Sequence, residues 1–186
     1  MRAALAFIVL ATTSVAAQAP KPDQNVNPTA ATLQDFKARV DQYMSVRKKV
    51  KGNAPPLKQT PDPAEIRVAT EALATAIREA RPDARQGDIF TPDVQMVFRH
   101  LLSPELKGED GQHAKKVLKD DAPTGVPLKV NAKYPDGKSF PTVPSNLLLN
   151  LPKLPPEVEY RIIGKNLILR DTGADLIVDF MLNAIK

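Results

Sequence analysis

The chain has 186 residues, with 26 Lys and Arg against 21 Asp and Glu, a formal net charge of +5, and neither cysteine nor tryptophan. The lack of cysteine excludes disulfide bonds, thiolate metal sites, a cysteine nucleophile and a lipid attached to cysteine. The charge is mildly positive and mixed along the sequence, which is typical of ordinary solubility and predicts no nucleic-acid partner.

Residues 1–19 have the three parts of an export signal. Arg2 supplies a positive start, Ala3–Val15 form an apolar stretch, and small residues follow, with cleavage expected after Ala19 or, alternatively, Ala17. The apolar stretch is shorter than the roughly twenty residues that span a bilayer, so we expect a cleaved signal and no transmembrane segment in the mature chain. The sequence lacks an Arg-Arg pair near its start, which favours the general export route. The predicted location is the periplasm or the extracellular space.

Residues 20–31 are rich in proline and poor in apolar side chains, and we expect a flexible leader there. A helix is predicted from about Thr32, where Thr32-Leu-Gln-Asp35 resembles a capping box, to Gly52. Its basic end, Arg47–Lys51, complements the helix dipole and is interpreted as structural. Apolar residues spaced three and four apart give this helix a packing stripe made up of Leu33, Phe36, Val40, Tyr43, Met44 and Val50.

Three further helices are expected before residue 120. Asn53–Thr60 form a linker, and Asp62 then caps a helix that runs to about Ala80 and pairs with the first as an antiparallel hairpin. A capped helix follows at Thr91–Leu102, and a shorter one at Asp110–Lys119. Residues 32–120 are therefore predicted to be helical.

The pattern changes to alternation near residue 126. Val126–Tyr134 are predicted to form a half-buried strand, and Leu147–Leu151 a short helical turn. Val158–Ile163, Leu167–Arg170 and Leu176–Phe180 read as three short strands joined by turns that tolerate positive φ. The expected fold class is α+β, in which residues 121–186 form a small antiparallel meander of about four strands covered by the helices.

The segment from Tyr160 to Phe180 resembles the hairpin that ends periplasmic nickel/cobalt-homeostasis proteins. The resemblance lies in the spacing of strands and turns, and the helices upstream do not match that group. The whole chain also looks similar to a family of small exported bacterial proteins known only as uncharacterised. These resemblances imply an exported protein, and no functional residue can be carried over from either.

Asp171-Thr172-Gly173-Ala174 lies between two apolar strands and resembles the catalytic loop of retroviral-type aspartic proteases. Asp171 would then be the catalytic carboxylate. Such chemistry needs two loops that share a proton, hence a homodimer. The family also places a flap and further strands after the loop, whereas this chain ends at Lys186. We therefore interpret the loop as a turn.

The remaining candidates for chemistry are isolated. His100 and His113 have no zinc-motif spacing, although a site that combines them with Glu105 and Asp110 is conceivable. Ser139 and Ser145 lack a nucleophile-elbow context, and Ser45-Val-Arg-Lys48 lacks the companion motifs of penicillin-binding enzymes. Two acidic pairs could support glycoside cleavage but are interpreted as surface charge: Asp120 with Asp121, and Glu157 with Glu159.

We therefore assign no catalytic, cofactor-binding or metal-ligating residue and expect no cofactor. The first hypothesis is a non-enzymatic accessory or binding protein of the bacterial envelope, whose partner is another envelope protein or, alternatively, an acidic envelope polymer. The second is a hydrolase acting on a cell-wall, ester or peptide substrate through His100, Asp171 or paired carboxylates. The third is a periplasmic metal-handling protein.

Overall fold

The computed structural model describes residues 27–52, 62–120, 126, 128–134 and 145–185. The proposed signal at 1–19 and the proposed linker at 53–60 lie outside the described residues. Helices precede a small sheet in the order α1 (Pro28–Lys51), α2 (Pro63–Ala80), α3 (Pro92–Leu102), the 3₁₀ turn η1 (Pro104–Leu106), α4 (Gly108–Asp120), α5 (Ser145–Leu149), β1 (Val158–Ile163), β2 (Asn166–Asp171) and β3 (Leu176–Met181). The predicted α+β class is confirmed.

Helix α1 begins at Pro28, four residues before the expected start at Thr32. Asn27 is the N-cap, since its side-chain oxygen accepts from Thr29 N at 3.0 Å, and Pro28 suits the first helical position. The Thr32 hydroxyl instead donates to the Pro28 carbonyl at 2.9 Å, one turn back within the helix. The expected leader at 20–31 therefore overlaps the helix, and its earlier part lies outside the described residues.

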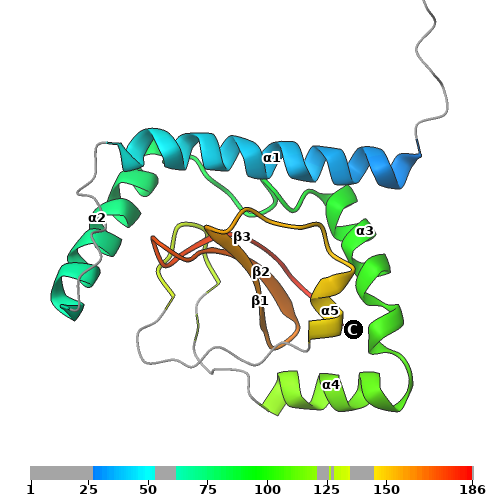
Figure 1. Cartoon of the computed structure of the whole chain (residues 1–186). Helices are drawn as coiled ribbons and strands as arrows, with labels where there is room; N and C mark the ends of the chain where they lie inside the picture. Colours follow the sequence, from blue (N-terminus) through cyan, green and yellow to red (C-terminus); the bar gives the residue numbers. More distant parts are fainter. Residues whose placement is uncertain (1–26, 53–61, 121–125, 127, 135–144, 186) are drawn as a thin grey trace, which may run out of the picture.

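Helices α2 and α3 begin where their capping residues predict. Asp62 accepts from Ala64 N at 2.8 Å, and Thr91 Oγ1 accepts from Val94 N at 3.4 Å. In Figure 1, α1 lies across one side of the sheet, and α3 and α4 continue around it. Helices α1 and α2 are in contact, as expected. However, α2 leads away from α1 in Figure 1, so the pair does not run side by side along its length.

The three strands form an antiparallel meander in the order β1-β2-β3, as predicted. Gly164, at φ +59°, turns the chain between β1 and β2, and Asp175, at φ +52°, lies just before β3. Both residue types tolerate the left-handed region, which explains why these tight connections are readable from the sequence.

A bulge in β3 changes the direction of one side chain. Leu169 pairs with Asp179, but the next residue, Arg170, pairs with Ile177, so Val178 is left without a partner in the register. Because of the extra residue, Val178 and Asp179 both face the helices. The bulge thus places a carboxylate against the loop that precedes α3.

The expected strand at Val126–Tyr134 is reduced in the structure to one bridge, Lys133 with Leu176. The segment still exchanges hydrogen bonds with β3, through Asn131 N to Ile177 O at 2.8 Å and Ile177 N to Ala132 O at 2.9 Å. Asn131 has φ +64°, which turns the chain and interrupts the extended run. The described sheet has three strands where about four were expected.

Both faces of the sheet are covered by apolar side chains. One face packs on the helices in a core that joins Phe36 of α1, Ile77 of α2 and Phe98 of α3 to Leu169 and Leu176 of the strands. The other face carries a smaller cluster formed by Tyr134, Ile163, Ile168, Ile177 and Phe180, with Val126, Leu128 and Val130 against it. The 126–134 segment therefore acts as a cover for the second face.

Candidate functional site

Asp171, the carboxylate of the protease-like loop, has no solvent exposure. Its Oδ2 accepts from the Tyr43 hydroxyl at 2.8 Å and from Arg47 Nε at 2.5 Å. Its Oδ1 accepts from the backbone N–H groups of Gly173 and Ala174 at 2.9 and 2.8 Å. With these contacts and no exposed surface, the carboxylate is a structural anchor that ties the β2–β3 turn to α1.

The same loop explains why glycine occupies position 173. A Cβ atom there would stand 2.7 Å from Arg47 Nη2, so a side chain would push the guanidinium away from Asp171. Arg47 itself is only 5 % exposed. Burial, followed by the charge of Asp171, raises the pKa of Tyr43, so its hydroxyl stays protonated and remains a donor.

Asp179 is a second carboxylate with no exposed surface, and the loop before α3 encloses it. It accepts from the backbone N–H groups of Gly87 at 2.9 Å, Ile89 at 2.8 Å and Phe90 at 2.7 Å. Burial raises the pKa of Asp179 above its usual value, and these hydrogen bonds act in the opposite direction. The contacts assign Asp179 to holding the loop on β3.

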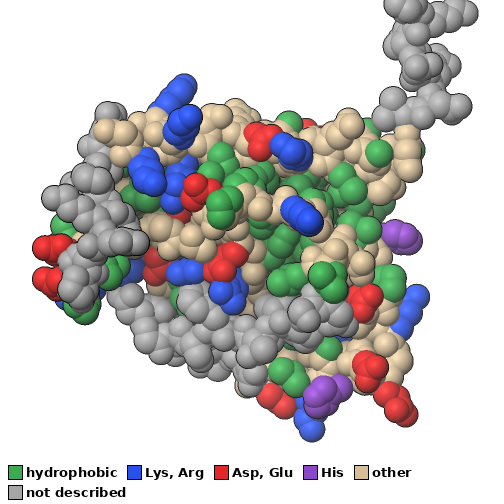
Figure 2. Space-filling view, viewed as in Figure 1, with side chains coloured by type: hydrophobic (Ala, Val, Ile, Leu, Met, Phe, Trp, Pro, Cys, Tyr) green, Lys and Arg blue, Asp and Glu red, His purple; other side chains and the backbone are tan. Residues whose placement is uncertain are grey.

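The structure does not bring the conceivable metal ligands together. His100, His113 and Asp110 are exposed, and Glu105 is half-buried beside the amide of Asn150, whose Nδ2 donates to it at 3.2 Å. In Figure 2 the two histidines lie apart on the surface. Among the described residues, no three histidine or acidic side chains are grouped in a way that could hold a metal ion.

In the acidic pair Glu157 and Glu159, the two residues contact different partners. Glu159 accepts from Arg161 Nη2 and from Arg170 Nη1, both at 2.7 Å. Burial acts to raise the pKa of Glu159, but the hydrogen bonds from the two arginines outweigh it and hold the pKa below 4.5. Glu157 contributes its backbone carbonyl to Thr172. Asp120 ends α4, and Asp121 lies outside the described residues.

Of the serine candidates, the structure describes the side chain of Ser45, which gains no catalytic partner among the described residues. The hydroxyl of Ser45 donates to the Asp41 carbonyl at 2.9 Å on the exposed side of α1. Ser145 begins α5, and Ser139 lies outside the described part of the chain. The contact of Ser45 is that of an ordinary helical serine, and no nucleophile is assigned.

Helix α1 instead forms one wall of an apolar groove of about 420 Å³. The opposite wall is the extended segment Pro152–Pro155, which Tyr160 holds by donating from its hydroxyl to Pro152 O at 3.0 Å. Figure 2 shows hydrophobic side chains gathered below α1 on this face. The groove is lined by Leu33, Phe36, Val40, Pro152, Leu154 and Pro155, with Lys37, Asp41 and Lys153 at its charged rim.

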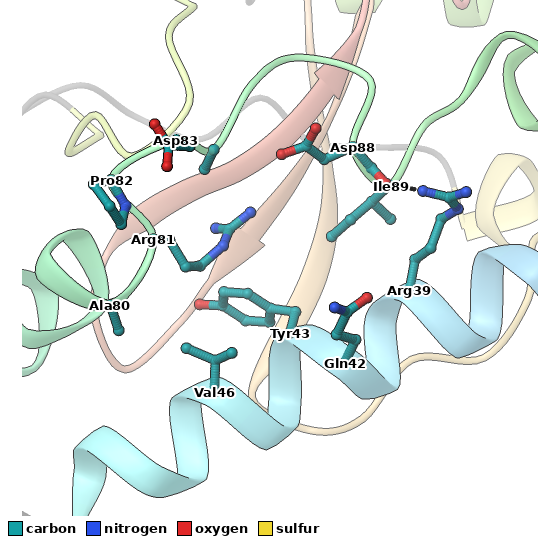
Figure 3. Close-up of a pocket in the computed structure, with 11 residues that line it drawn as sticks. Arg39, Gln42, Tyr43, Val46, Ala80, Arg81, Pro82, Asp83, Asp88 and Ile89 are labelled. Atoms are coloured by element: carbon teal, nitrogen blue, oxygen red, sulfur yellow. Dashed lines mark hydrogen bonds between the residues drawn. The ribbon is translucent and has the colours of Figure 1, made fainter.

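The same helix bounds a second, polar cavity of about 430 Å³. Its other wall is the segment 80–89, which connects α2 to α3. Arg39, Gln42 and Tyr43 line it from α1, and Arg81 and Asp88 from the connecting segment. Figure 3 shows the side chains of Arg81 and Asp88 directed toward one another across this space.

The sequence did not reveal Arg47 or the two cavities. Arg47 follows Tyr43 by four residues, so it lies on the same face of α1 as the apolar stripe. This spacing is the feature of the sequence from which its burial could have been predicted. The cavities join α1 to segments 80–89 and 152–155, which periodicity cannot place beside it.

No protein-family model, curated protein or solved structure matches this chain. Within the described residues, no helix has both the length and the apolar character needed to cross a membrane.

Proposed function

We propose that the chain is an exported, non-enzymatic accessory protein that binds a segment of another envelope protein in the apolar groove. The observation that carries the proposal is the groove itself, an open apolar surface between a helix and an extended proline-containing segment. Hydrophobic grooves of this kind bind the apolar side chains of a helix or an extended peptide. Residues 1–19 support delivery to the periplasm or the extracellular space.

The rim of the groove favours a partner with acidic residues beside its apolar ones. Lys37 and Asp41 satisfy each other, with Nζ 2.6 Å from Oδ2. Lys153, at the opposite wall, is exposed and adds a further positive charge. Because a rim charge acts mainly on the rate of association, Lys153 would guide an acidic segment toward the groove rather than supply most of the affinity.

Site-specific photo-crosslinking tests this function. A photoreactive residue placed at position 153 in the exported protein should capture a defined envelope protein through an apolar segment with acidic neighbours. That segment, made as a peptide, should bind the purified chain saturably. Leu154→Ser should weaken binding by tenfold or more, because Leu154 lines the groove.

Met96→Ser is the matched control, since Met96 is 65 % exposed and belongs to α3, away from the groove residues. Its peptide affinity should equal that of the wild type. The proposal is wrong if the captured segment is polar, if Leu154→Ser binds as tightly as the control, or if the protein turns over an envelope polymer and captures no protein.

A further inference from the structure

The polar cavity is a site separate from the groove and lies on another side of α1. It occupies about 430 Å³ between α1 and segment 80–89, within the usual range for a small-molecule site. Its walls carry opposite charges from different elements, as Figure 3 shows. Some of these charges already have a partner within the fold, and others form no ion pair among the described residues.

Arg39 is compensated by its surroundings. Its Nε donates to Asp35 Oδ2 at 2.8 Å, and its Nη1 donates to the Asp88 carbonyl at 2.8 Å. The second contact holds α1 against the connecting segment. We therefore regard Arg39 as a structural wall of the cavity.

Arg81 is held in place but is not paired. Its guanidinium carbon lies 5.0 Å from the centre of the Tyr43 ring, and Nη1 donates to Asn131 Oδ1 at 3.3 Å. Within the described residues this is its only side-chain hydrogen bond, and it forms no ion pair. Burial lowers the pKa of Arg81, because the cation is partly removed from water, and the charges of Tyr43, Asp88 and Asp179 act in the opposite direction from a distance. A bound anion would compensate this charge.

Asp88 supplies the opposite charge. Its Oδ2 accepts from Arg85 N at 2.8 Å, and within the described part of the chain its carboxylate forms no ion pair. Figure 3 shows this carboxylate directed toward the interior of the cavity, whereas that of Asp83 is turned away. A simple anion on Arg81 would therefore approach a second anion at Asp88.

We propose that the cavity binds a small zwitterion, an α-amino acid, with its carboxylate on Arg81 and its ammonium group on Asp88. Arg81 and Asp88 attract each other without direct contact, and one ligand between them gives each charge a direct partner and leaves neither facing a like one. The Gln42 amide lines the same space and offers both a donor and an acceptor to the ligand. The site does not depend on the apolar groove, so either proposal can fail without the other.

Isothermal titration calorimetry with alanine, acetate and ethylammonium tests the site, because the latter two each carry half of the zwitterion. Alanine should bind saturably and at least tenfold more tightly than either half. Asp88→Asn retains an acceptor for Arg85 N, and Arg81→Gln retains much of the side chain. Each should weaken alanine binding by tenfold or more.

Asp83→Asn is the matched control, since it removes a carboxylate from the same wall that is turned away from the cavity. It should bind alanine like the wild type. Circular dichroism of each variant checks that the fold is retained, and Asp88→Asn keeps the test valid if Arg81→Gln does not fold. The proposal is overturned if alanine does not bind, if acetate binds as tightly as alanine, or if Asp88→Asn has the affinity of the control.

Discussion

A buried carboxylate is stable only where charge and hydrogen bonds compensate its lost hydration, and Asp171 shows how this chain meets the requirement. Two side chains of α1 and two backbone N–H groups of its own turn surround it. The residue that resembles a protease catalyst is thus used to fix the helix on the sheet. The motif Asp171-Thr172-Gly173-Ala174 is therefore explained by the turn that it forms, because its carboxylate is buried and accepts hydrogen bonds from that turn.

Arg47→Met should lower the free energy of unfolding by about 3–5 kcal/mol, because it leaves the Asp171 charge buried without its cation. Urea denaturation at neutral pH measures the change. Lys49→Met is the control, since it removes an exposed cation from the same helix and should change stability by less than about 0.5 kcal/mol. Equal effects from the two substitutions would contradict a structural role for the buried pair.

Because the pKa of Glu159 is lowered in the folded protein, we expect the stability of the protein to depend on pH. Its pKa is below 4.5 in the folded protein, so the unfolded chain binds more protons in the interval between the folded value and 4.5. The stabilisation is therefore complete above pH 4.5 and is lost as the pH falls through the folded value. Glu159→Gln should lower stability by about 1 kcal/mol at pH 7 and make little difference at the acidic end.

Thermal unfolding of wild type and Glu159→Gln between pH 7 and pH 3 measures this effect. The difference in Tm should shrink as the pH falls. Glu79→Gln, which removes an exposed carboxylate of α2, should follow the wild-type curve throughout. A difference for Glu159→Gln that is constant with pH would show that the arginine contacts do not favour the charged form.

At the level of elements, the helix caps and strands that depend on neighbouring residues are the features that the sequence predicts. The caps at Asp62 and Thr91 and the three C-terminal strands could be predicted because each depends on residues close in sequence. The segment 126–134 alternates like a strand, but Asn131 turns the chain.

The predicted start of α1 at Thr32 is also wrong, because Asn27 and Thr32 both have a side-chain oxygen that can cap a helix and only the fold selects between them. The two cavities depend on long-range packing, so no local pattern predicts them.

The contact between η1 and α4 depends on Gly111. A Cβ atom at this position would lie 2.3 Å from the carbonyl carbon of Leu106 and 2.6 Å from its oxygen. Because the obstacle is backbone, Gly111→Ala should force the two elements apart and cost about 1–3 kcal/mol. Chemical denaturation compares it with Gly52→Ala, where φ is −63° and the nearest atom is 3.5 Å away. Gly52→Ala should be neutral or slightly stabilising, and a neutral Gly111→Ala would contradict the close approach.

For the molecule as a whole, the helical and β regions share one core. Phe36 of α1 packs with Phe90, Phe98 and Tyr160, and the Phe36–Phe98 ring centroids are 4.9 Å apart. Asp171 and Asp179 add polar ties between the sheet and the segments at α1 and before α3. The main core is built from both regions, and only the smaller cluster on the other face of the sheet lies within the β region alone, so we expect the two regions to unfold together.

Two substitutions test this cooperativity. Phe36→Ala in α1 should destabilise the protein by about 3–5 kcal/mol, and Leu169→Ala in β2 by about 2–5 kcal/mol, because both residues are at most 1 % exposed. Each should shift a single transition, with the same midpoint by far-ultraviolet circular dichroism, which follows mainly the helices, and by hydrogen exchange of the backbone amides of β1–β3, which follows the sheet. Independent folding of the two regions would instead leave one signal unchanged in each variant. Because Phe36 and Leu169 belong to the same apolar cluster, we expect both signals to move together in both variants.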